Sequence, residues 1–256
     1  MRNITKLLIL PVVLCLALAS QSATARNFSN ETLHYKVMYK WGIIQKQAGT
    51  ATFTLKNSAD RYKLMLTAAS APWADRIYRV RDTLSGEIMR ADLRPVEYTK
   101  RAHEKDERKL DCVRFSYAGG KVNGQCTRVK WDKNGKKVRD EKRELQAVGT
   151  TVDMLSSFVY MRSLPFTSWK PGHSHTITIF SGKEKETLTM RYIGVAMVEH
   201  GGKKQQAYHI RFVFTGKGGK KTSDDMDAWI STTAARIPLR LEGKLPVGKV
   251  QCILTD

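Results

Sequence analysis

The chain has 256 residues, of which 44 are Lys or Arg and 24 are Asp or Glu, so its formal charge is +20. Its hydrophobic fraction of 41% is near that of globular proteins, which excludes a wholly disordered chain. The charge favours a polyanionic partner, and by itself it suits nucleic acid, anionic lipid and acidic glycan equally.

Residues 1–25 are typical of a cleaved secretory signal. Arg2 and Lys6 precede an apolar run at 7–19, and the small residues Ala23-Thr24-Ala25 form a cleavage pattern. The apolar run is shorter than the roughly 20 residues that a helix needs to cross a bilayer. We therefore expect export to the periplasm, cleavage after Ala25 and no transmembrane helix in the mature protein, which is either free or peripheral to a membrane.

Export changes which polyanions the positive charge can attract. Removal of residues 1–25 takes away two basic residues and no acidic one, which leaves 231 residues with a charge of +18. Because an exported protein rarely meets chromosomal DNA, the expected partners are anionic lipid, lipopolysaccharide, an acidic glycan or another envelope protein, and not nucleic acid. The alternative, that the basic residues serve solubility and protect strand edges, stays open.

Residues 26–256 are predicted to form a single β-rich domain, because most segments alternate apolar and polar residues with a period of two. In the first such segment, 33–41, aromatic and aliphatic residues share one face. The expected strands are 33–41, 49–55, 62–68, 80–89, 96–103, 109–117, 124–131, 137–145, 174–180, 186–195, 207–214, 228–241 and 249–254. This series predicts an antiparallel curved sheet that forms a barrel or half-barrel, and the shortage of crossover helices excludes a doubly wound α/β fold.

Two segments interrupt the strand pattern. Residues 72–78 predict one helical turn with Trp73 and Ile77 on the same side. A stronger helix is expected at 153–163, where apolar residues recur at helical spacing and Leu164-Pro165 follow as a stop. Thr151 or Asp153 can cap its start. A single apolar-faced helix among so many strands predicts a plug or lid on the concave face of the sheet.

The spacing of two cysteines predicts a disulfide. A three-residue turn centred on Gly119 would pair Tyr117 with Lys121 and place Cys112 directly opposite Cys126. Opposed residues at a non-hydrogen-bonded pair lie close enough to be bridged. The alternative is a pair of reduced, half-buried cysteines, and zinc is disfavoured because no further ligand motif is nearby.

Several segments together resemble the exported domain-of-unknown-function 3108 family over nearly the whole mature chain. These segments are Glu31-Thr-Leu-His-Tyr35 with Tyr39 and Gly49, Asp153-Met-Leu-Ser-Ser-Phe-Val-Tyr-Met-Arg162 with Leu164-Pro165, Trp229-Ile-Ser231, Arg236-Ile-Pro238 and Val247-Gly248. The resemblance implies an envelope protein of Gram-negative bacteria with a mainly antiparallel β architecture and no established reaction. One departure is the absence of an acidic residue at 232–235, where the family tends to carry one.

The candidate ligand-binding residues are Arg162, Tyr35, Tyr39 and Trp41. Arg162 follows the apolar face of the expected helix, and its guanidinium suits either a buried carboxylate or the anion of a ligand. The three aromatic residues lie on the face of the first strand that is expected to line a curved interior, where they suit a lipidic or glycan ligand.

No pattern identifies a catalytic residue, a metal site or a cofactor. His173 and His175 lack a third ligand nearby, and the acidic cluster at 224–227 lacks the spacing of a calcium loop. A Gly-x-Ser-x-Gly elbow is also missing. The preferred hypothesis is a non-catalytic binding or scaffolding domain for a lipidic, glycan or protein ligand. The alternative is a glycan-acting hydrolase or lyase, which requires histidines and carboxylates to converge in a cleft.

Overall fold

The structure, a computed structural model, describes residues 27–245 and 247–255, so the expected signal at 1–25 lies outside the described part. It is built on a single sheet of 15 strands. The strands are β1 (Glu31–Trp41), β2 (Ile44–Ser58), β3 (Arg61–Ser70), β4 (Val80–Met89), β5 (Pro95–Glu104), β6 (Glu107–Ala118), β7 (Lys121–Trp131), β8 (Lys137–Val148), β9 (Thr151–Asp153), β10 (Ser174–Phe180), β11 (Lys185–His200), β12 (Lys203–Thr215), β13 (Met226–Ser231), β14 (Pro238–Lys244) and β15 (Lys249–Leu254). The helices are α1 (Pro72–Tyr78) and α2 (Ser156–Ser163), with short 3-10 turns at Phe166–Ser168 and Lys217–Gly219.

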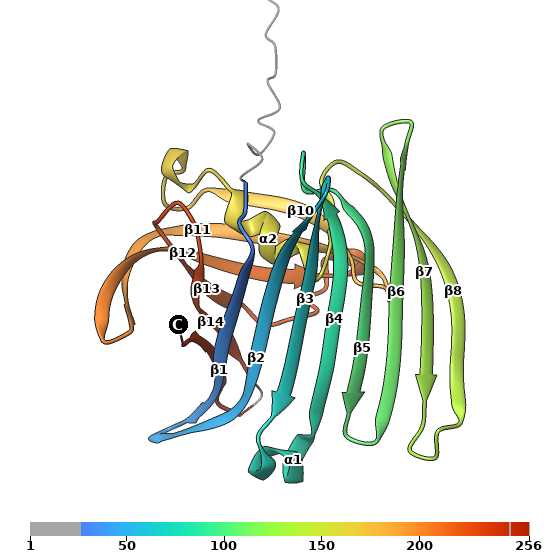
Figure 1. The fold of residues 1–256 in the computed structure, drawn as a ribbon, viewed down its shortest axis with the longest axis horizontal. Coiled ribbons are helices and arrows are strands. Elements are labelled where there is room, and N and C mark those ends of the chain that lie inside the picture. Colours follow the sequence, from blue (N-terminus) through green and yellow to red (C-terminus); the bar gives the residue numbers. More distant parts are fainter. Residues whose placement is uncertain (1–26, 246, 256) are drawn as a thin grey trace, which may run out of the picture.

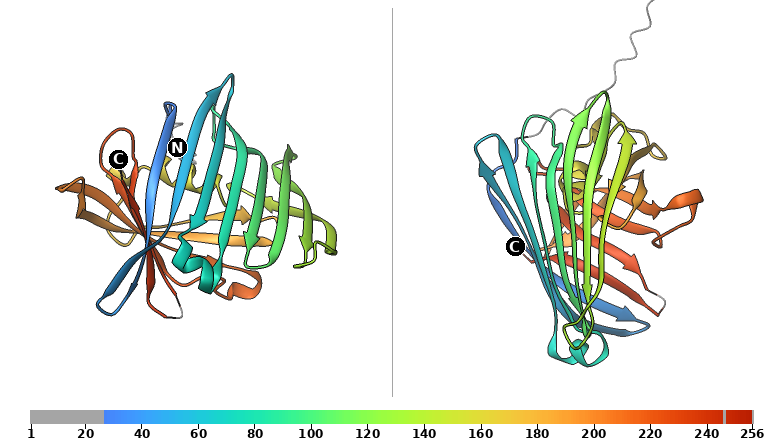
Figure 2. Two further views of the ribbon diagram at one scale, coloured as in Figure 1. Left: turned by 60° about the horizontal axis from the view of Figure 1, so that its bottom comes forward. Right: turned by 90° about the vertical axis from the view of Figure 1, so that its right-hand side faces the viewer.

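The sheet is a nearly closed barrel whose two edges are β8 and β9. Strands β1 to β8 follow one another as an antiparallel meander, and β1 also pairs with β15, so that the first and last described strands lie side by side. From β15 the sheet continues back to β10, and β9 adds a short parallel pairing. Figure 1 shows β1 to β8 as one wall with β10 to β14 crossing behind it, and Figure 2 shows both walls meeting along β1. The prediction of a mainly antiparallel, curved β sheet is confirmed.

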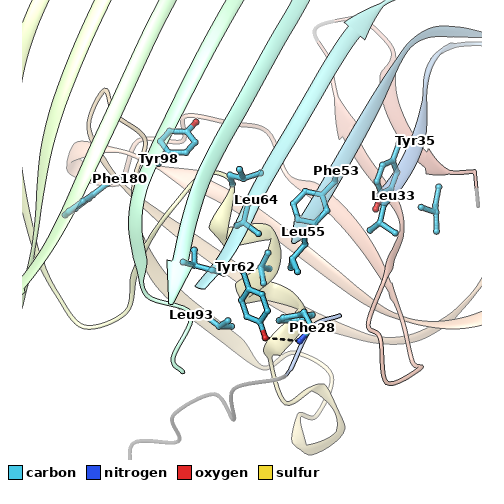
Figure 3. Close-up of a cluster of buried hydrophobic side chains, with 14 of the residues drawn as sticks. Phe28, Leu33, Tyr35, Phe53, Leu55, Tyr62, Leu64, Leu93, Tyr98 and Phe180 are labelled. Atoms are coloured by element: carbon cyan, nitrogen blue, oxygen red, sulfur yellow. Dashed lines mark hydrogen bonds between the residues drawn. The ribbon is translucent and has the colours of Figure 1, made fainter. Parts of the chain in front are cut away.

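The interior is filled by two apolar clusters that share α2. Leu155 and Val159 belong to the cluster behind β1 to β7, whereas Tyr160, Met161 and Leu164 belong to the cluster against β10 to β13. Figure 3 shows part of the first cluster, in which the large side chains of neighbouring strands point to one side of the sheet. The helix therefore lies between the two walls, and seven of its eight residues are buried. None of the described helices is long and apolar enough to cross a bilayer.

Two element boundaries differ from expectation. The helix begins at Ser156 rather than at residue 153, because residues Thr151–Asp153 pair with β10 as β9. The single strand expected at 228–241 is two strands, β13 and β14, joined by a reversal in which the amide of Ile237 donates to the hydroxyl of Ser231 at 2.9 Å. In the reversal Arg236 has a φ of +50°, which periodicity alone does not reveal.

The predicted disulfide between Cys112 and Cys126 is wrong, because the β6–β7 turn has a different length. Ala118 pairs with Lys121, so the turn consists of Gly119 and Gly120, both with positive φ, rather than of three residues. The shorter turn moves the register by one residue and places Cys126 opposite Val113. A slip of one residue sends a side chain to the other face of a sheet. Cys126 is accordingly buried in the interior, and Cys112 lies on the opposite face with its thiol free.

This arrangement predicts that all three cysteines of the described chain are alkylated when the protein is unfolded without reductant. In the folded protein, burial raises the pKa of Cys126 and Cys252 to about 11, so these two thiols should react slowly at neutral pH. Peptide mapping by mass spectrometry after alkylation in denaturant measures the outcome. A peptide pair linked through Cys112 and Cys126 in natively purified protein would contradict the observed register.

Candidate functional site

The candidate site is an apolar pocket of about 410 Å³ between α1 and the adjoining ends of β1, β2, β3 and β15. Small residues on β2, β3 and α1 leave the space, and aromatic residues on β1 and α1 form its walls. The small residues are Ala48, Gly49, Ala68, Ala69 and Ala74, and the aromatic ones are Tyr39, Trp73 and Tyr78. Among the described residues that line the pocket, none is charged.

A β-bulge in β2 lies at the pocket. Val37 pairs with Gly49 but the next residue, Met38, pairs with Gln47, so that Ala48 is an extra residue in β2. At the bulge the carbonyl of Gln47 faces α1, and the carbonyl of Ala48 extends the β2–β3 pairing to Ala71, the residue before α1. The amide of Ala71 donates to the carbonyl of Ala48 at 2.7 Å, and the indole of Trp73 donates to the carbonyl of Gln47 at 2.7 Å. The irregularity in the sheet therefore holds the helix that covers the pocket.

An ion pair fixes the other side of α1. The guanidinium of Arg81 on β4 binds the carboxylate of Asp75, with Nη2 and Oδ2 2.8 Å apart. Hydrogen bonds from Arg81 and Ser70 lower the pKa of Asp75, so the carboxylate stays ionised at neutral pH. At the start of the helix, Pro72 occupies a position where its missing amide hydrogen has no cost. The short helix thus keeps its place although none of its residues is fully buried.

Of the four predicted ligand-binding residues, the structure brings one to this pocket. Tyr39 lines it and donates its hydroxyl to the carbonyl of Val247 at 3.1 Å. Tyr35 lies deeper in the barrel, where burial raises the pKa of its hydroxyl and the hydroxyl donates to Pro238 at 2.9 Å. Trp41 lies beyond the pocket at the tip of the β1–β2 hairpin and is more than half exposed.

Arg162 lies outside the pocket, and its guanidinium contacts the protein itself. It binds both carboxylate oxygens of Glu31 on β1, the second at 3.0 Å. It also donates to the carbonyls of Arg236 and Ala235 at 3.0 Å each, and it lies 4.7 Å from the centre of the Phe28 ring. Of the two partners expected for Arg162, the structure shows the buried carboxylate. Sequence reasoning missed Glu31 as that partner, because 131 residues separate the two.

A second cavity of about 700 Å³ lies at the opposite end of the barrel, where β4 turns into β5 and β6 into β7. Here Tyr160 and His175 share a hydrogen bond of 2.9 Å between the hydroxyl and Nε2. Burial and the neighbouring His173 lower the pKa of His175, so its imidazole is neutral at pH 7. The lining carboxylate, Asp92, forms an ion pair with Arg94.

The histidines and carboxylates considered from the sequence do not converge. His173 and His175 are neighbours but, within the described chain, no group of three His, Cys, Asp or Glu residues could hold a metal ion. Asp225 pairs with Lys221, and Asp227 on β13 contacts His209 and Arg211 on β12. The residues that form the apolar pocket were not predicted as a group, and the only signal for them was the side shared by Trp73 and Ile77.

Comparison with known proteins supports the fold and identifies a family. A model of the family described as "Protein of unknown function (DUF3108)" matches residues 34–255. Among solved structures, the chain is similar to the crystal structure of a β-barrel-like protein of the domain of unknown function DUF1849 from Brucella abortus. The two share 11% sequence identity and a TM-score of 0.62, with 91% of this chain and 98% of that chain covered. At this identity the likeness concerns the fold alone. No curated protein shows a significant match.

Proposed function

The chain belongs to the DUF3108 family of proteins of unknown function, and we propose that it is a non-catalytic, exported envelope protein that binds a lipidic ligand in the apolar pocket beneath α1. The predicted signal at 1–25 supports export to the periplasm. In this proposal α2 is a plug that fills the middle of the barrel and leaves the ligand the space at the α1 end.

The observation that carries the proposal is the uncharged, mainly aliphatic and aromatic lining of the pocket. Its volume of about 410 Å³ falls within the range of roughly 300–1,000 Å³ typical of small-molecule sites. An acyl chain would gain from leaving water for such a surface, at roughly 25 cal/mol for each Å² of apolar area buried. A lipid tail is thus the ligand that the pocket fits best.

A glycan ligand fits the pocket less well, because each buried sugar hydroxyl needs a hydrogen-bonding partner. The lining offers few free ones. Ser70 already accepts from the amide of Val80 at 2.8 Å, and Tyr39 donates to Val247. The alternative of a glycan-acting hydrolase or lyase would gain support from an acid and a base meeting in one cleft. The cavity at the opposite end of the barrel is lined by Tyr160, His175 and Asp92, but the carboxylate of Asp92 already forms an ion pair with Arg94.

Filling the pocket should abolish lipid binding. We expect Ala74→Phe to raise the dissociation constant of a fluorescent fatty acid, such as cis-parinaric acid, at least about tenfold, since overpacking by one ring costs roughly 1–3 kcal/mol. Fluorescence titration of the delipidated protein measures the effect, and native mass spectrometry of protein from its own envelope identifies the natural ligand.

The matched control is Ala91→Phe, which places the same ring in the cavity at the opposite end of the barrel. It should leave the titration unchanged. The reverse result, with Ala91→Phe weakening binding and Ala74→Phe neutral, would move the ligand to the larger cavity. If the wild type binds no fatty acid or phospholipid probe, the proposed function is wrong.

A further inference from the structure

Apolar side chains are exposed on three turns at the end of the barrel that contains the pocket. Ile43, at the tip of the β1–β2 hairpin, is fully exposed, Ile77 on α1 is 73% exposed, and Val247 in the β14–β15 turn is 56% exposed. Trp41 and Leu245 add to the same surface. These five residues, here called the apolar tip, come from three segments far apart in the sequence.

The three segments are joined by direct contacts. The hydroxyl of Tyr39 on β1 binds the carbonyl of Val247, and α1 is tied to β2 through Trp73 and the carbonyl of Gln47. Gly248 packs so closely on Lys40 and Trp41 that an added Cβ would collide with the carbonyl of Lys40. The tip of the β1–β2 hairpin and α1 are both at the lower end of the barrel in Figure 1. The apolar tip is therefore one surface, and the pocket opens within it, since Ile77 and Leu245 also line the pocket.

The composition of the tip departs from that of the other hairpins. Turns usually consist of Gly, Asn, Asp and other polar residues. The β11–β12 turn follows this rule with Gly201 and Gly202 between His200 and Lys203. The β1–β2 turn instead places Gly42 and Ile43 between Trp41 and Ile44. An exposed tryptophan and two isoleucines at a hairpin tip are not needed for the turn.

Basic residues surround the apolar tip. Arg76 and Arg79 are exposed on α1 and at its end, and Lys244 is exposed beside the β14–β15 turn. Lys46 and Lys105 lie over the rings of Trp73 and Tyr78, with Nζ to ring-centre distances of 4.6 and 5.1 Å. Within the described residues, none of these five cations is within ion-pair distance of a carboxylate. The surface thus combines exposed apolar and aromatic groups with cations that form no ion pair with a carboxylate of the described residues.

We propose that the apolar tip inserts into the interface of an anionic lipid bilayer, with the surrounding lysines and arginines on the headgroups. Aromatic residues together with Lys and Arg are the usual composition of protein surfaces that enter the membrane interface, and the acidic headgroups supply the missing counter-charges. The inference deepens the proposed function, and it rests on that function for the role of the pocket. A pocket that opens within an inserted surface faces the acyl chains of the bilayer directly. A lipid tail could then pass between bilayer and pocket without crossing water.

Vesicle binding tests the inserted surface separately from the pocket. The full mature chain is floated with vesicles of equal parts phosphatidylglycerol and phosphatidylcholine. We expect the Ile43→Ser/Val247→Ser variant to bind about tenfold or more weakly, because neither residue lines the pocket and both lose apolar contact with the bilayer. The matched control, Val148→Ser/Met197→Ser, removes side chains that are 73% and 57% exposed elsewhere on the barrel and should bind as the wild type does.

The charge contribution has its own pair of variants. Arg76→Gln/Arg79→Gln should weaken binding to the anionic vesicles by roughly fivefold for each charge removed, and added salt should weaken wild-type binding. Lys217→Gln/Lys220→Gln, on the exposed loop between β12 and β13, removes the same charge away from the tip and should have little effect. Equal loss from both pairs would overturn a localised docking surface.

Depth of insertion is measured by quenching of tryptophan fluorescence with brominated lipid. Quenching should fall in Trp41→Phe and persist in Trp169→Phe, because Trp169 lies near His175 at the other cavity. The inference is wrong if the wild type does not bind vesicles, or if the Ile43→Ser/Val247→Ser variant binds them as tightly as the wild type does. Binding of a protein at this end of the barrel would not rescue it. The Ile43→Ser/Val247→Ser variant should bind the fatty acid probe as the wild type does. The Ala74→Phe variant should bind the probe more weakly and should still bind vesicles. A failure of the membrane proposal can therefore be distinguished from a failure of the proposed lipid binding in the pocket.

Discussion

Glu31→Ala is expected to lower the free energy of unfolding by about 3–5 kcal/mol, because it leaves the guanidinium of Arg162 buried without its carboxylate. Arg162 has no exposed surface, and its other hydrogen bonds go to the neutral backbone carbonyls of Arg236 and Ala235. The penalty arises from the uncompensated charge more than from the lost bond itself. Urea denaturation followed by tryptophan fluorescence measures it.

Two comparisons separate this effect from a general loss of charge. Asp140→Asn breaks a half-exposed pair with Lys137 and should leave the free energy of unfolding almost unchanged, because water screens this pair. In Glu31→Gln/Arg162→Met both charges are gone, so much of the stability lost in Glu31→Ala should return. If Glu31→Ala costs no more than Asp140→Asn, the buried pair does not hold β1 against α2.

The buried pair joins several of the segments that carry the family resemblance. Glu31 on β1, Arg162 on α2 and Arg236 in the β13–β14 reversal meet at one place. Tyr35, four residues after Glu31 on β1, donates its hydroxyl to the carbonyl of Pro238, which follows that reversal. These residues join three segments that are distant in sequence and hold β1, α2 and the β13–β14 reversal together. The pocket shares Tyr39 and Gly49 with the segments that carry the resemblance, but none of the residues of the ion pair lines it.

Much of the sheet was predictable because burial of one face imposes a period of two on each strand. The prediction failed where the backbone departs from regular pairing. In the β6–β7 hairpin the choice between a two-residue and a three-residue turn decides which face Cys126 occupies, and either choice keeps the alternation. In the β13–β14 segment the reversal is set by Ser231 and by the positive φ of Arg236, for which the sequence has no glycine signal.

The candidate site was harder to predict for a similar physical reason. The pocket lies beside the extra residue Ala48 in β2, where the carbonyl of Gln47 accepts from the indole of Trp73 on α1, and a β-bulge has no clear signal in a strand pattern. Alanines at half-buried strand positions are also common where no cavity exists. Tyr39 was predicted because it alternates with the core residues of β1, whereas Trp41, two residues further, passes beyond the barrel interior and reaches solvent.

Asp153 combines a structural role with an unusual ionisation. Its carboxylate accepts hydrogen bonds of 2.8 Å from the amides of Leu155 and Ser156, and one of 2.7 Å from the hydroxyl of Ser156, at the point where β9 passes into α2. These bonds favour the charged form, but the side chain is almost completely buried. The loss of hydration is the larger effect and raises the pKa of Asp153 to about 6.

Asp153→Asn is therefore expected to change how stability depends on pH. Between the unfolded pKa near 3.9 and the folded pKa of about 6, the folded protein holds a proton that the unfolded chain has released. The contribution of this carboxyl to stability is therefore full below about pH 4 and is lost as the pH rises through 6. Measured against the Asp153→Asn variant, the wild type should lose about 2 kcal/mol from pH 4 to pH 7. Carboxylates whose pKa is lowered, such as Asp75 beside Arg81 and Asp140 beside Lys137, act in the opposite direction, but both proteins carry them and they cancel in the difference. Urea denaturation of both proteins at matched pH values gives that difference directly, and a difference that stays constant across this range would show that Asp153 is ionised throughout and that its hydrogen bonds outweigh its burial.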